Sequence, residues 1–85
     1  MRIYMQTTQG SDQPLRFYQL HLQKDLLGSW ILVRESGFQG SRGQVKRSYF
    51  KTRDEAEQAM SRLRDMQAKR GYRVVFREGS IKEAG

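Results

Sequence analysis

Cysteine is absent from this chain of 85 residues, and proline and histidine occur once each. Without cysteine the chain can form no disulfide and has no thiolate chemistry, a composition compatible with a reducing cytoplasm. The lone histidine, His21, has no second histidine or cysteine with which to hold a metal ion, so we expect no metal and no other cofactor. No group of residues suited to acid–base or nucleophilic catalysis stands out either. The sequence therefore predicts a non-catalytic protein.

Long hydrophobic runs are also missing. The clearest apolar run, from Trp30 to Val33, is far shorter than the roughly 20 residues that span a bilayer. The N-terminus does not have the charged-then-apolar pattern of a signal peptide. We therefore expect a soluble cytoplasmic protein with neither a membrane partner nor a small-molecule substrate.

Acidic residues are scarce relative to basic ones. The 16 lysines and arginines outnumber the 9 acidic residues, which gives a formal net charge of +7. A basic domain attracts polyanions, and nucleic acid is the usual one. Hydrophobic residues make up 36% of the chain and aromatic residues 11%, which is too much for a disordered basic tail. A chain this short supports one modest core, so we expect a single folded domain over residues 1–85.

Strand patterns recur along the chain. Alternation of apolar and polar side chains predicts a strand over residues 17–23, whose core-facing side chains would be Tyr18, Leu20 and Leu22. Runs of β-branched and aromatic residues predict shorter strands at 3–5, 30–34, 45–50 and 72–77. Residues 25–28 have turn composition, so the strands on either side of them should form a hairpin.

One helix is predicted between the last two strands. Thr52 and Glu55 have the spacing of a capping box at a helix start, and Gly71 marks the end. Apolar residues then recur at steps of three and four, which predicts a buried stripe of Ala56, Ala59, Met60, Leu63 and Met66. The predicted fold class is α+β, a twisted antiparallel sheet of about four to five strands with one amphipathic helix packed on it. Residues 1–15 would form a strand and a connector, and residues 78–85 a flexible tail.

The region between Ser36 and Arg53 contains no acidic residue. Its glycine-rich part, residues 36–43, is expected to be a long hairpin loop, since it lacks the Gly-Lys-Ser/Thr ending of a phosphate-binding P-loop. Its cations predict contacts with a phosphate backbone, made by Arg42, Lys46, Arg47 and Lys51 with Arg34 nearby. The alternative is a solvated surface that only keeps the protein in solution. Strand alternation places Lys46 and Arg47 on opposite faces, so one ligand reaches both only if their strand is twisted or at an edge.

Two further candidate contacts lie beside this region or beyond it. Phe38 is an aromatic residue on the basic loop and could stack on an unpaired base. Lys69 and Arg70 end the predicted helix, where cations also favour the helix dipole, and with neighbouring arginines they suggest a second basic surface.

The order of these features resembles the WGR domain, a small fold found in poly(ADP-ribose) polymerases and in many short bacterial proteins. The resemblance is carried by the runs Arg16–Leu20 and Asp25–Glu35, the glycine-punctuated loop and the helix closing at Lys69–Tyr72. It implies the α+β fold above and a role in binding DNA. In the polymerases the signature tryptophan packs on a sugar at a strand end, and the arginine reaches DNA or a neighbouring domain.

The signature tripeptide is altered in this chain to Ser36, Gly37 and Phe38. Serine has no face to stack on a sugar, and phenylalanine cannot pair with a phosphate. Two hypotheses follow. The first is a non-catalytic nucleic-acid-binding module whose partner is DNA rather than RNA, and the alternative is a protein–protein interaction module that has lost the family's contacts with DNA ends.

Overall fold

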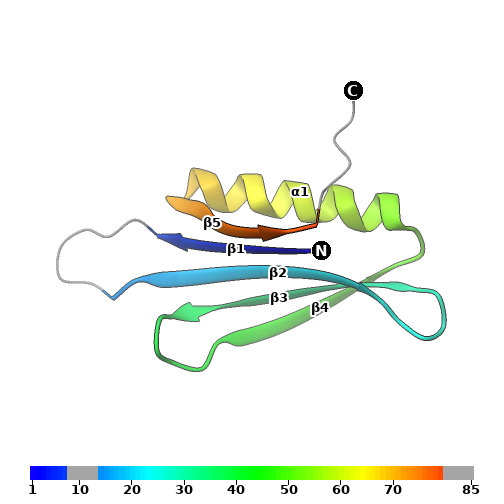
Figure 1. Cartoon of the computed structure of the whole chain (residues 1–85), viewed down its shortest axis with the longest axis horizontal. Coiled ribbons are helices and arrows are strands. Elements are labelled where there is room, and N and C mark those ends of the chain that lie inside the picture. Colours follow the sequence, from blue (N-terminus) through cyan, green and yellow to red (C-terminus); the bar gives the residue numbers. More distant parts are fainter. Residues whose placement is uncertain (8–13, 80–85) are drawn as a thin grey trace.

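A computed structural model describes residues 1–7 and 14–79 of the chain. Its elements are, in chain order, β1 (Arg2–Thr7), β2 (Arg16–Lys24), β3 (Trp30–Phe38), β4 (Gln44–Phe50), α1 (Arg53–Lys69) and β5 (Tyr72–Glu78). The five strands form one sheet in the order β4-β3-β2-β1-β5, with every neighbouring pair antiparallel, and α1 runs along one side of it (Figure 1). The predicted α+β fold with one helix on a sheet is confirmed. No helix of the described residues is long and apolar enough to cross a membrane.

The core lies between α1 and one face of the sheet. Side chains alternate along the strands, so every second residue of β1, β2 and β3 points toward the helix. The largest side chains with less than 2% exposure are Ile3, Met5, Leu20, Leu32 and Met60. Tyr18, Leu20 and Leu22 are all buried as predicted. We call the opposite side of the sheet the helix-free face.

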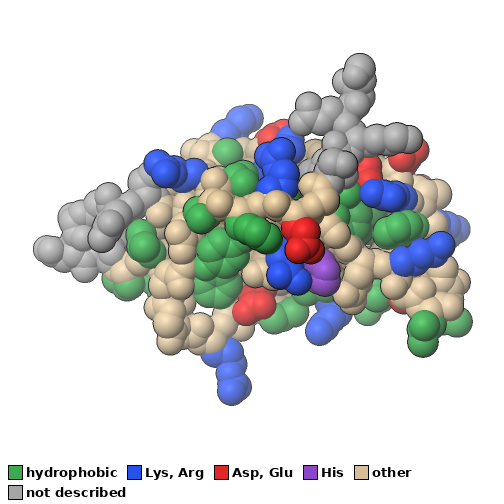
Figure 2. Space-filling model, viewed as in Figure 1, with side chains coloured by type: hydrophobic (Ala, Val, Ile, Leu, Met, Phe, Trp, Pro, Cys, Tyr) green, Lys and Arg blue, Asp and Glu red, His purple; other side chains and the backbone are tan. Residues whose placement is uncertain are grey.

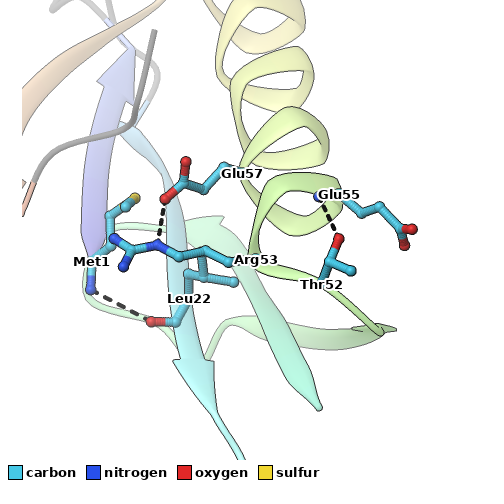
Figure 3. A network of polar contacts seen from close by, with 6 residues as sticks. All are labelled: Met1, Leu22, Thr52, Arg53, Glu55 and Glu57. Atoms are coloured by element: carbon cyan, nitrogen blue, oxygen red, sulfur yellow. Dashed lines mark hydrogen bonds and ion pairs between the residues drawn. The ribbon is translucent and has the colours of Figure 1, made fainter. Parts of the chain in front are cut away.

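Helix α1 begins at the predicted cap. The Thr52 hydroxyl accepts a hydrogen bond of 3.2 Å from the Glu55 backbone N–H, which satisfies one of the free N–H groups of the first turn (Figure 3). Asp54 and Glu55 place negative charge beside the positive end of the helix dipole. At the other end Gly71 takes φ of +99°, a left-handed conformation that suits glycine and leads directly into β5.

The buried stripe of α1 differs from the prediction at its C-terminal end. Ala56, Ala59 and Met60 are buried and Leu63 is partly buried, but Met66 keeps 48% of its surface exposed. Gln67 is buried in its place. At 3.6 residues per turn, Gln67 lies only about 20° around the helix from Ala56, whereas Met66 lies about 80° away. The prediction for Met66 was therefore wrong because its spacing drifts off the core-facing stripe.

Polar contacts gather near the start of the helix and the neighbouring end of the sheet (Figure 3). Arg53 Nε donates a 2.6 Å hydrogen bond to Glu57 Oε1, one turn further along α1. The Met1 amino group lies 3.4 Å from the Leu22 carbonyl oxygen, and the Leu22 N–H donates back to the Met1 carbonyl at 2.9 Å. The Arg53 guanidinium also lies 5.6 Å from the centre of the Trp30 ring, a cation–π distance. Of these contacts, the one between Arg53 and Trp30 joins α1 to the sheet.

Strand β3 is longer than predicted, and this corrects the expected loop. Ser36, Gly37 and Phe38 belong to β3 rather than to the connection, because β2 pairs with them as far as Arg16 opposite Phe38. Strand β5 is also one residue longer than predicted, because it includes Glu78, the first residue of the predicted C-terminal tail. Of the predicted connector, residues 8–13 lie outside the described residues, as do residues 80–85 of the predicted tail.

Candidate functional site

Strand β4 is an edge strand, which decides the geometry of the predicted site. Lys46 pairs with Arg34 and so shares the helix side of the sheet, whereas Arg47 pairs with Val33 and points to the helix-free face. On an interior strand these two cations would be separated by the sheet itself. At an edge, a ligand lying along the strand can contact both faces. We name the exposed side chains along this strand and its flanks the β4 cationic edge: Arg42, Lys46, Arg47 and Lys51.

Within residues 1–7 and 14–79, these cations form no ion pair with a carboxylate. The ion pairs within the described part of the chain are Arg53 with Glu57 at 2.6 Å and Arg64 with Asp65 at 3.1 Å. The nearest acid in the strand register is Glu35, which lies on β3 beside Val45 and is packed beneath the loop at Gly43. The described residues therefore do not neutralise the charge of the β4 cationic edge.

Arg34 adds a partly buried donor next to this edge. Its Nε is shielded from solvent and has no hydrogen-bond partner among the described residues. A buried donor left unpaired is costly, so an acceptor arriving from outside would be favoured. Burial raises the pKa of the neighbouring Tyr18 hydroxyl, and the positive charge of Arg34 offsets part of that rise.

Lys69 and Arg70 lie at the other side of the sheet. They end α1 and connect through Gly71 to β5, which is the edge strand opposite β4. Four spacings of about 4.8 Å separate these two edges, or about 19 Å across the sheet. The structure therefore brings Arg34 and the β4 cationic edge together and leaves Lys69 and Arg70 as a separate basic region.

The model of one protein family, the WGR domain, matches residues 1–79. The chain belongs to the WGR domain family. WGR domains are small nucleic-acid-binding modules that are typically non-catalytic on their own. The searches of curated proteins and of solved structures gave no match.

The WGR signature positions lie at the end of β3. Gly37 faces the backbone of the following loop so closely that an added Cβ would lie 3.2 Å from the Gly43 Cα. A Cβ at Gly43 would in turn lie 2.8 Å from the Phe17 Cζ, so a side chain at Gly43 would force its neighbours to move, and one at Gly37 would need a smaller shift. Phe38 keeps 42% of its surface exposed, and the Arg16 guanidinium lies 4.9 Å from its ring centre. Its predicted role as a stacking residue thus competes with an intramolecular cation–π contact.

Sequence reasoning missed a group of side chains on the helix-free face of this WGR domain. Tyr4 and Phe17 are stacked with their ring centres 6.1 Å apart, and Phe76 lies beside Tyr4 on β5. Arg2, on the same face, has a buried Nε without a hydrogen-bond partner among the described residues. The alternation in β2 indicated that Phe17, Gln19 and His21 share this face, but nothing in the sequence indicated which strands would lie beside them.

Proposed function

We propose that this WGR domain binds DNA without catalysis and holds the phosphate backbone through Arg34 and the β4 cationic edge. The observation that carries the proposal is the placement of exposed lysines and arginines on both sides of one edge strand, with no ion pair to a carboxylate of the described residues. Phosphate contacts of this kind are independent of base sequence. The domain would therefore bind duplex DNA with little preference for sequence.

Electrostatic binding has a characteristic dependence on salt. Each cation that contacts a duplex phosphate displaces condensed counterions, so affinity falls as salt rises, with about 0.9 log unit of slope per contact. A domain that used the four residues of the β4 cationic edge would lose affinity steeply over a modest rise in salt concentration. Salt dependence thus measures how many of these cations are in use.

Titration of a fluorescent DNA duplex at several salt concentrations tests the proposal. Replacing Lys46 and Arg47 together by Ala should weaken binding and reduce the salt slope by up to about 1.8 log units, which is two contacts' worth. The matched control replaces Lys69 and Arg70 by Ala, which removes the same charge from the opposite edge of the sheet. Equal losses in the two double variants would mean that net charge alone, rather than the β4 cationic edge, governs binding.

A second candidate function is protein–protein interaction, and one observation favours it. Leu26 and Leu27, at the tip of the β2–β3 hairpin, have exposures of 104% and 92%. The turn beneath them is held by Asp25 Oδ1, which accepts hydrogen bonds from the Leu27 and Ser29 N–H groups at 2.9 and 2.8 Å. Failure of the wild-type domain to bind any DNA at low salt would remove the first proposal and favour this one.

A further inference from the structure

The helix-free face of the sheet carries aromatic and amide side chains in adjacent rows. Register places Phe76, Tyr4 and Gln19 side by side across β5, β1 and β2. The next row toward the β3–β4 loop contains Arg73, Gln6 and Phe17. Figure 2 shows hydrophobic side chains gathered over β5, β1 and β2, with lysine or arginine, acidic and histidine side chains among them. We name Tyr4, Phe17 and Phe76 the aromatic patch.

Contacts hold two of the three rings of the aromatic patch, Tyr4 and Phe17, although no helix covers them. Phe17 is buried at 9% exposure because Tyr4 stacks on it at an interplanar angle of 8° and the loop at Gly43 packs against its edge. The Tyr4 hydroxyl accepts a 2.6 Å hydrogen bond from Gln39 Nε2, which fixes the tilt of the ring. Phe76 lies beside Tyr4 on the edge strand β5 and keeps 48% of its surface exposed. Flat rings fixed in this way lose little conformational entropy when a flat ligand stacks on them.

The surroundings of the patch indicate the chemistry of that ligand. Arg2 and Arg73 flank the aromatic residues on the same face, and the buried Nε of Arg2 has no hydrogen-bond partner in the described part of the chain. Two acids of the described residues share this face: Glu78 lies opposite Arg2 and two residues from Phe76, and Glu35 lies beside Phe17 where both meet the loop at Gly43. Glutamine side chains at positions 6 and 19 can donate to and accept from base edges. A stack of bases joined by phosphates matches rings, amides and cations together, whereas an apolar protein surface matches only the rings.

We propose that the helix-free face binds unpaired bases of single-stranded DNA, which stack on Phe76 and Tyr4 while Arg2 and Arg73 contact the adjoining phosphates. This inference rests on the proposed function for the choice of DNA, but it uses a different surface. Duplex phosphates lie along the β4 cationic edge, and a single strand crosses the sheet between β5 and β2. The two sites can therefore be removed separately.

Fluorescence anisotropy with a labelled thymidine oligomer tests the proposal. Phe76→Ala should weaken binding of the oligomer about 5- to 150-fold, as expected for loss of one base–aromatic stack, and should leave duplex binding unchanged. Phe76→Leu keeps an apolar side chain on the edge strand but removes the ring. If stacking is responsible, this variant should also bind the thymidine oligomer more weakly. The matched comparison is Phe38→Leu, at a phenylalanine of similar exposure on the other side of the sheet. If only Phe38→Leu weakens binding, stacking occurs at the end of β3 and the proposal is wrong.

An oligomer of abasic sites separates stacking from charge. It carries the same phosphates without bases, so it should bind the wild-type domain more weakly than the thymidine oligomer and should not respond to Phe76→Ala. Equal binding of the two oligomers would overturn the proposal. Tighter binding of a uridine oligomer, with the same loss in Phe76→Ala, would assign the face to RNA and overturn the choice of DNA. A wild-type domain that binds the thymidine oligomer but no duplex would instead count against the β4 cationic edge alone.

Discussion

Between the sheet and α1, the side chains of Ile3, Leu20 and Met60 are completely shielded from solvent. On the helix-free face, by contrast, Phe76 keeps 48% of its surface exposed. The same strands supply both faces, because successive residues of a strand point in opposite directions. Apolar residues therefore perform two different tasks in this domain. On one side they form the core, and on the other they form the partly exposed aromatic patch.

The difference follows from the dimensions of the elements. One helix with its side chains is about 10–12 Å across, whereas five strands span about 19 Å. Helix α1 therefore cannot cover even one face of the sheet completely. The helix side of β3 and β4 stays partly open, and this is where Arg34 and Lys46 lie. A domain with five strands and one helix therefore keeps exposed surface on both sides of its sheet.

The largest expected effect comes from the covered face. Met60→Ala should lower the free energy of unfolding by about 2–5 kcal/mol, because it leaves a cavity between α1 and the sheet. Met66→Ala is the control on the same helix, and since Met66 is half exposed its effect should stay within about 0.5 kcal/mol. Urea denaturation measures both. Similar losses in the two variants would show that α1 is rotated relative to the arrangement described.

An intermediate effect is expected from the loop that packs on the helix-free face. Gly43→Ala should destabilise the domain by about 1–3 kcal/mol, because the added Cβ would lie 2.8 Å from both the Phe17 Cζ and the Glu35 Cγ. Arg42→Ala, at the exposed neighbouring position, provides the control and should be nearly neutral. If a thermal melt shows no difference between the two variants, the loop does not press on Phe17.

The smallest effects are those of pH, and the two faces should respond at opposite ends of the scale. On the helix-free face, burial and the charges of Arg2 and the N-terminus lower the pKa of His21 below 6.5, so the folded protein favours neutral histidine. Unfolding then takes up a proton, and stability is lost as pH falls through 6.5. On the covered face, burial raises the pKa of Tyr18 above 10.0, so stability is lost as pH rises through 10.0.

Single substitutions assign these two limbs of the pH profile. His21→Gln should flatten the loss of stability between pH 7 and about 5, a range above the usual carboxylate pKa values. Tyr18→Phe should flatten the loss above pH 10.0 and leave the acid limb unchanged. An acid limb that is unaltered in His21→Gln would mean that other groups cause it.

Local patterns were sufficient to predict most of the covered face. The alternation in β2, the cap at Thr52 and the glycine after α1 all describe interactions between residues that are close in sequence, and each is confirmed. The glycines at positions 37, 40 and 43 led to the wrong boundary for β3. The pairing of Ser36 and Gly37 with distant residues of β2 outweighed the loop composition.

The candidate site was less accessible to sequence reasoning because it depends on strand order. Local composition identified the cations of the β4 cationic edge, but only the tertiary pairing shows that β4 lies at an edge. The aromatic patch depends on strand order and also on an irregularity in the pairing of β1 with β5. The register shift between Tyr4 and Met5 brings Phe76, rather than Val75, opposite Tyr4, and strict alternation would not predict this.

Both edges of the sheet also present backbone N–H and C=O groups that no neighbouring strand of the described residues takes up. Such edges invite pairing with another chain, which is how many β proteins begin to aggregate. Along β4 the lysine and arginine side chains oppose that pairing by repulsion between copies, and along β5 the bulge interrupts the flat pattern it requires. Substitutions that neutralise β4 therefore also remove a safeguard, so the Lys46 and Arg47 variants should be compared at low protein concentration, with light scattering to verify that each remains dispersed.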